Sequence, residues 1–114
     1  MEKRTEILIL FDIYGNLLTE KQKNVMDYYY NDDLSLSEIG ENSNISRQAI
    51  HDTIKRCEKL LYEYEEKLQL LKKNYILEQT KSKVNDLLEE LTFLDNQEVN
   101  DIVQKIYKEL KEIN

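Results

Sequence analysis

Hydrophobic residues recur at helical spacing along most of the chain, and this pattern predicts a series of α-helices. The first expected helix covers residues 4–16, with its apolar positions at Ile7, Leu10, Phe11, Tyr14, Leu17 and Leu18. The stretch TEKQ from Thr19 is a capping box, in which Thr19 and Gln22 would satisfy each other's free backbone N–H groups. A second helix should therefore begin there and extend to about residue 30.

A second pair of start signals follows at short range. Ser35 and Glu38 form another capping box, and the helix that they start should end near residue 42. Ser46 can cap the next helix, and Ile45 and Ile50 have the spacing of a hydrophobic staple. Two helix starts about eleven residues apart predict a helix–turn–helix, which is the most specific local signal in the sequence.

The helix that begins at Ser46 has no evident stop signal. Apolar residues alternate spacings of four and three at Ile50, Ile54, Cys57, Leu61, Tyr64, Leu68, Leu71 and Tyr75, so one helix is expected to extend to about residue 78. A short helix with Val84, Leu87, Leu88, Leu91 and Leu94 should follow, and then a last helix capped by Asp95 or Asn96, with apolar residues Val99, Ile102, Val103, Ile106, Leu110 and Ile113. The second half of the long helix outruns a helix–turn–helix core and needs a partner, either the rest of the chain or a second subunit.

The composition supports an all-α protein. The 114 residues include no proline and two glycines, with 40% hydrophobic and 34% charged residues, which fits one small domain with an appended helical segment. The longest apolar stretch, ILILF from Ile7, is far too short to span a membrane. The single cysteine, Cys57, cannot form an internal disulfide and is expected to be a buried hydrophobic residue. These features predict a soluble, cytoplasmic protein.

The helix from Ser46 carries a polar face that could contact nucleic acid. With Ile50 facing inward, the exposed side and its edges hold Arg47, Gln48, His51, Asp52, Lys55, Arg56 and Lys59. In a recognition helix, the N-terminal residues contact base edges and the later basic residues lie near phosphate. Gln48 could pair with adenine, Arg47 with guanine, and Asp52 could accept a hydrogen bond from cytosine.

The net charge of −7 opposes binding to phosphate. However, residues 34–62 hold four basic and four acidic residues, so the acidity lies outside the helix–turn–helix. Three or four phosphate contacts for each protomer would give weak binding, and two protomers would double that number. DNA binding is therefore expected from a homodimer, with Tyr64, Leu68, Leu71 and Tyr75 as the oligomerisation residues. The alternative is that the apolar row from Ile50 to Tyr75 forms the core of a helical bundle within one chain.

The run LSEIGENSNISRQAIHDTIKRCEKLL resembles the YlxM family of small bacterial helix–turn–helix proteins and, more distantly, the −35-binding region (region 4) of sigma factors. The resemblance covers about the first 70 residues. It implies a winged-helix-like or sigma-region-4-like domain over residues 1–70, a long extended recognition helix, and a C-terminal helical extension over residues 71–114. Because genes of this family usually lie beside those of the signal recognition particle GTPase or its receptor, the resemblance also implies a regulatory or accessory role in that pathway.

The sigma-type contacts transfer only in part. Arg47 stands at a matching arginine, whereas Gln48, His51 and Asp52 replace the glutamate, arginine and glutamine that the sigma pattern often has. Promoter reading therefore does not carry over. The second interpretation is a scaffold that kept the fold and binds the particle's GTPase or its RNA without binding DNA.

Catalysis has almost no support in the sequence. There is no glycine-rich phosphate loop and no metal-ligand cluster, and the single His and Cys lie on different faces of one helix. We therefore expect no enzyme activity, no cofactor and no metal. The run of Tyr28, Tyr29 and Tyr30 could stack on bases, but core packing is the favoured interpretation.

Overall fold

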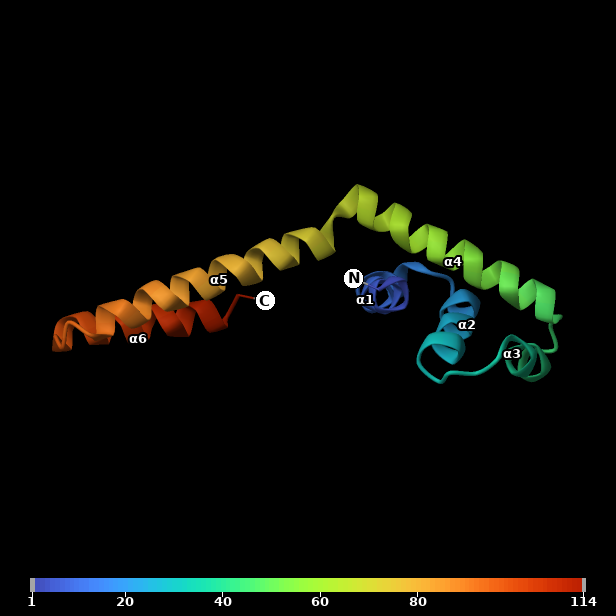
Figure 1. Ribbon diagram of the computed structural model, residues 1–114, viewed down its shortest axis with the longest axis horizontal. Helices are drawn as coiled ribbons and strands as arrows, with labels where there is room; N and C mark the ends of the chain where they lie inside the picture. Colours follow the sequence, from blue (N-terminus) through green and yellow to red (C-terminus); the bar gives the residue numbers. More distant parts are fainter. Residues whose placement is uncertain (1, 114) are drawn as a thin grey trace. The chain divides into compact units, whose positions relative to one another are not determined.

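The computed structural model describes residues 2–113, which form six α-helices and one short 3-10 helix (Figure 1). The elements are α1 (Lys3–Tyr14), η1 (Gly15–Leu17), α2 (Glu20–Tyr30), α3 (Leu36–Ser43), α4 (Arg47–Leu68), α5 (Leu70–Thr92) and α6 (Gln97–Lys111). The all-α prediction is confirmed. The chain forms two compact units, Met1–Leu71 and Lys72–Asn114.

Both predicted capping boxes are present. Thr19 Oγ1 accepts from the Gln22 backbone N–H at 3.2 Å, and Gln22 Oε1 accepts from the Thr19 N–H at 3.0 Å. The Ser35 and Glu38 pair repeats this arrangement, with both distances at 3.1 Å. These side chains satisfy N–H groups that the first turn of a helix leaves unpaired, and they therefore fix where α2 and α3 begin.

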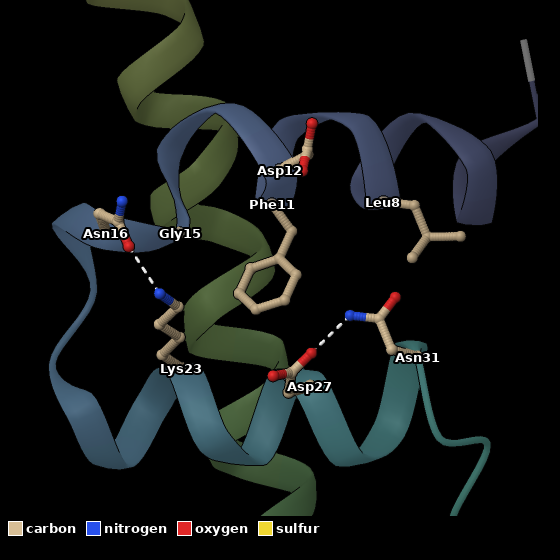
Figure 2. A pocket seen from close by; sticks show the side chains of 8 residues that line it. All are labelled: Leu8, Phe11, Asp12, Gly15, Asn16, Lys23, Asp27 and Asn31. Carbon is tan, nitrogen blue, oxygen red and sulfur yellow. Dashed lines mark hydrogen bonds between the residues drawn. The ribbon is translucent and has the colours of Figure 1, made fainter.

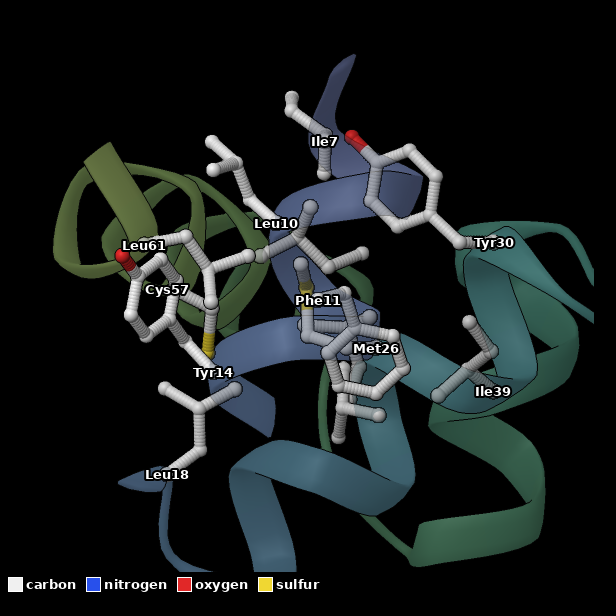
Figure 3. Close-up of a cluster of buried hydrophobic side chains, with 13 residues drawn as sticks. Ile7, Leu10, Phe11, Tyr14, Leu18, Met26, Tyr30, Ile39, Cys57 and Leu61 are labelled. Atoms are coloured by element: carbon white, nitrogen blue, oxygen red, sulfur yellow. The ribbon is translucent and has the colours of Figure 1, made fainter. Parts of the chain in front are cut away.

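The core of the first unit lies where α1, α2 and α3 pack against α4 (Figure 3). Its buried residues are Ile7, Leu10, Phe11, Tyr14, Leu18, Val25, Met26, Tyr30, Ile39, Ile50, Ile54, Cys57 and Leu61. The predicted burial of Cys57 is confirmed, since its exposure is 0%. Of the three consecutive tyrosines, Tyr30 is buried in this core and Tyr29 packs at its edge.

The prediction of a single helix from Ser46 to residue 78 is wrong, because the helix is interrupted at Gln69. There the backbone adopts the left-handed conformation, with φ 55° and ψ 32°, and α4 ends one residue earlier. The expected gap before a separate helix at Val84 is also wrong, since α5 continues unbroken to Thr92. The helical pattern is continuous through Gln69, so hydrophobic spacing alone gave no sign of the break.

The break is stabilised by two side chains from elsewhere in the first unit. The Tyr14 hydroxyl accepts from the backbone N–H of Leu70 at 3.0 Å, and Glu65 Oε1 accepts from that of Leu71 at 3.0 Å. Tyr14 also donates to Glu65 Oε1 at 2.6 Å. The first N–H groups of α5 thus receive acceptors from a tertiary contact rather than from a local capping residue.

The second unit contains the rest of α5 and an antiparallel α6. Lys81 Nζ donates to the Ile113 carbonyl at 3.2 Å, while Tyr107 Oη donates to the Asn85 carbonyl at 3.5 Å, which fixes the antiparallel order. Asn96 caps α6 by accepting from the Val99 N–H at 3.2 Å, so the predicted cap is confirmed. Among the described residues of this unit, only Leu88 and Val103 are buried apolar side chains.

Candidate nucleic-acid interface

The helix–turn–helix is formed by α3, the turn at residues 44–46 and the first turns of α4. Asn44 ends α3 in the left-handed conformation with φ 58°, which asparagine tolerates well. The Ile45 N–H then donates to the Gly40 carbonyl at 2.9 Å. A Cβ on residue 40 would lie 2.6 Å from the Ile45 carbonyl oxygen, so glycine permits this close approach of α3 to the turn.

The N-terminal end of α4, which we call its exposed tip, is fixed by a side-chain cap. Ser46 Oγ accepts from the Ala49 N–H at 3.1 Å, and Ile50 is completely buried one turn later. Arg47 and Gln48 therefore project into solvent from the first turn. This is the position from which a recognition helix contacts base edges in the major groove.

Asp52 is at the centre of a small polar cluster on the same helix. Gln48 Nε2 donates to Asp52 Oδ1 at 3.0 Å, and His51 Nδ1 lies 3.6 Å from the same oxygen. The His51 side chain is 44% exposed, but its Nδ1 is buried and makes no hydrogen bond. The predicted face thus carries a carboxylate, and one Gln48 N–H is already engaged with it.

The later basic residues of α4 differ in what surrounds them. Lys55 Nζ lies 3.4 Å from Glu58 Oε1, and Glu58 is only 8% exposed. Tyr30 also donates to Glu58, and burial followed by this hydrogen bond raises the pKa of Tyr30 far above its usual value. Arg56 and Lys59 are exposed. Of the predicted basic contacts, Lys55 therefore lies beside a counter-charge.

Two further cations, which the sequence pattern did not reveal, lie next to Lys55. Lys3 and Arg4 of α1 line a hollow of about 290 Å³ together with Lys55, Glu58 and Tyr30. The Arg4 guanidinium lies 5.0 Å from the centre of the Tyr30 ring and 2.8 Å from Asp33 Oδ1. Some fifty residues separate Lys3 from Lys55, so no sequence motif or periodicity could have predicted that they line the same hollow.

A separate polar hollow of about 330 Å³ lies between α1 and α2 (Figure 2). The Phe11 ring forms part of its lining. Lys23 Nζ donates to Asn16 Oδ1 at 2.6 Å, and Asn31 Nδ2 donates to Asp27 Oδ1 at 2.5 Å. Lys23 and Asn31 thus donate to other residues that line the hollow, and this hollow gives no indication of a ligand.

The four residues predicted to mediate oligomerisation fall in different environments. Tyr64 and Leu71 pack against the core of the first unit, whereas Leu68 and Tyr75 are 44% and 64% exposed. The first half of the hydrophobic seam, from Ile50 to Leu61, is buried within the chain. The four residues do not form one exposed row.

The described part of the chain has three further properties. No helix within residues 2–113 is both long enough and apolar enough to cross a membrane. In the same range, no group of three or more His, Cys, Asp or Glu side chains is placed to hold a metal ion. Burial raises the pKa of the Cys57 thiol to about 11, so this thiol is largely protonated at neutral pH.

Comparison with known proteins identifies the family. The model of the family described as "Putative helix-turn-helix protein, YlxM / p13 like" matches residues 1–106. The chain belongs to this family. A UPF0122 protein of Clostridium kluyveri is 50% identical over 104 residues, which cover 91% of this chain and 94% of the relative. One from Clostridium acetobutylicum is 49% identical over 114 residues, covering 100% and 97%. One from Clostridium perfringens is 64% identical over 73 residues, covering 64% and 65%.

Membership of the YlxM / p13-like family agrees with the geometry of α3 and α4. The helix–turn–helix that the family description names is present here, with both helix starts capped by side chains. The resemblance to the YlxM family is thereby confirmed, and the match includes α5 and most of α6 as well as the first unit.

Proposed function

We propose that this protein is a regulatory nucleic-acid-binding protein that acts as a homodimer, with α4 inserted in the major groove of DNA. The observation that carries this proposal is the exposed tip of α4, where Arg47 and Gln48 project from a capped first turn behind a tight α3–α4 turn. Both side chains can make bidentate contacts with base edges, arginine with guanine and glutamine with adenine.

The phosphate contacts of this complex come from Arg56 and Lys59 on α4. Lys3 and Arg4 on α1 extend the basic surface around Lys55, which offsets the charge of Glu58. Each neutralised phosphate contributes about 0.9 to the slope of log affinity against log salt, so a few contacts for each protomer give modest affinity. Two copies on adjacent half-sites double the contact number, which is why the proposal includes a dimer.

The test is a selection of bound fragments from sheared genomic DNA of the source bacterium at low and high salt. A discrete set of fragments, retained at low salt and released at high salt, is expected. Gln48→Ala should then lower the preference for those fragments, while Lys59→Ala should weaken binding to all DNA about equally. If no fragment is enriched, or if both variants behave as the wild type does, α4 is not a recognition helix.

A second candidate function is favoured by Asp52. Its carboxylate lies on the face that would meet DNA and engages Gln48, which suits a surface that docks on a protein better than one that meets phosphate. On this alternative, the chain is an accessory factor of the signal recognition particle and binds its GTPase or its RNA. Adding these two molecules as competitors in the fragment selection distinguishes the functions, because retention of either one in place of DNA supports the second.

A further inference from the structure

The α5–α6 hairpin of the second unit carries an unusually apolar exposed surface. We call its outward row the side chains Ile76, Leu87 and Leu91 of α5, Ile102 and Ile106 of α6, and Ile113 just after α6, which are 36–61% exposed. A second row, the inward row, is less exposed and consists of Leu77, Val84 and Leu88 of α5 with Val99, Val103, Tyr107 and Leu110 of α6. The outward row has no partner among the described residues of this unit.

The two halves of the outward row lie on the same side of the hairpin. Successive residues of an α-helix are rotated by 100° about its axis. In both helices the outward row therefore lies roughly 80° before the inward row, in the direction in which the residue number increases. Because α5 and α6 are antiparallel, the same rotation brings both halves to one side. The hairpin therefore presents a single apolar face, as half of a four-helix bundle does.

The size of this face matches what a stable dimer buries. A large side chain presents on the order of 150–200 Å² when fully exposed, so the outward row amounts to roughly 400–600 Å² of apolar surface. A typical interface buries about 800 Å² on each partner, a little over half of it apolar. A unit of about 40 residues also rarely folds alone, and among the described residues of this one only Leu88 and Val103 are buried apolar side chains.

The distribution of charge along the hairpin favours a second copy of the hairpin as the partner, paired in the antiparallel direction. The end near the α5–α6 turn, residues 84–104, holds six acidic residues and no Lys or Arg. The open end, residues 72–83 and 105–113, holds seven Lys and three Glu. A second hairpin placed antiparallel to the first brings each acidic end against a basic end, whereas a parallel one would oppose like charges.

We propose that this face binds a second copy of the chain, with the two α5–α6 hairpins antiparallel in a four-helix bundle. The inference deepens the dimer on which the proposed function rests, because it names the surface and the direction of pairing. Leu87 and Leu91 meet the outward row of the partner near its open end. Glu90, beside that row, comes near Lys73 of the second copy.

The first test is the mass of the full chain by light scattering. The wild type should have about twice the chain mass of 13.7 kDa. Leu87→Asp combined with Leu91→Asp should give the mass of one chain, while Leu17→Asp serves as the matched control because Leu17 is 54% exposed in the first unit. A wild type of single-chain mass, or a double variant that still dimerises, overturns the proposal.

The second test reverses charges at exposed positions, where folding is not at risk. In the antiparallel bundle, Glu90→Lys or Lys73→Glu alone should weaken the dimer roughly 3–10-fold, because symmetry repeats each pair twice. The double variant should recover most of the wild-type affinity. In a parallel bundle Glu90 would face Glu90, so a tighter dimer for Glu90→Lys overturns the antiparallel direction.

Cross-linking gives an independent readout of direction. When Glu90→Cys and Lys73→Cys chains are mixed and oxidised, the mixed pair should be the main product. A product made only of identical pairs overturns the antiparallel order. Neither assay involves DNA, so a stable dimer that binds no DNA fails the proposed function alone, and a DNA-binding monomer fails this inference alone.

Discussion

The Tyr14 hydroxyl and the Glu65 carboxylate meet at 2.6 Å where α4 ends and α5 begins. Tyr14 belongs to α1, so the contact ties the first helix of the unit to the end of the long helix. Each partner also accepts a backbone N–H of the new helix, from Leu70 and Leu71 respectively. The helix break at Gln69 is therefore a feature of the packed first unit, stabilised by polar groups far apart in sequence.

Tyr14→Phe should destabilise the protein by about 1–3 kcal/mol, because it removes the donor to Glu65 and leaves the Leu70 N–H without its acceptor. Urea unfolding followed by circular dichroism measures this difference. Tyr64→Phe is the matched control, since the Tyr64 hydroxyl makes only a long contact of 3.4 Å with the Leu17 carbonyl. Equal losses in the two variants would show that the Tyr14–Glu65 contact does not stabilise the break.

The helix starts, the helix–turn–helix and the buried face of α4 could all be predicted from sequence, because local rules determine them. A capping box needs only residues three apart, as in Ser35 and Glu38, and a core face needs only its spacing. The break at Gln69 could not be predicted, since one of its two acceptors is Tyr14, more than fifty residues away. The same holds for the candidate interface. The exposed face of α4 follows from periodicity, but the approach of Lys3 and Arg4 to Lys55 depends on how α1 packs.

Gly40→Ala should destabilise the helix–turn–helix by about 1–3 kcal/mol, even though alanine favours helices more than glycine does. The added Cβ would lie 2.6 Å from the Ile45 carbonyl oxygen, and backbone must move to relieve that contact. Gly15→Ala is the comparison, because there the Cβ meets the Phe11 ring at 3.1 Å and a side chain can move aside. Thermal unfolding of both variants checks the order; a Gly15→Ala loss as large as that of Gly40→Ala would contradict it.

Stability should fall as pH rises from about 9 to about 12. A hydrogen bond to Glu6, followed by burial, raises the pKa of Tyr62 to about 12, and burial raises the pKa of Cys57 to about 11. Their ordinary values are 10.0 and 9.0, so over this range the unfolded chain loses protons that the folded chain keeps. The contribution of these groups is complete below pH 9 and is lost as pH approaches the folded values.

Urea unfolding at several pH values, with phenolate absorbance recorded in parallel, measures this decline. Tyr62→Phe should reduce the loss of stability at the higher pH values. Glu6→Gln should change it in the same direction, because each substitution removes the interaction that keeps Tyr62 neutral. A Tyr62→Phe curve with the slope of the wild type would show that Tyr62 does not contribute.

Asp52→Asn should increase DNA affinity several-fold at low salt if α4 enters the major groove. The change removes a negative charge from the face that meets DNA, while the amide oxygen can still accept from Gln48 Nε2. Glu66→Gln removes the same charge from an exposed position near the other end of α4 and should have a smaller effect. Fluorescence anisotropy with one selected fragment at two salt concentrations measures both variants. Because long-range electrostatics would shift them equally, only a larger gain for Asp52→Asn places the DNA at the first turns of α4. Equal gains would mean that the DNA lies elsewhere on the molecule.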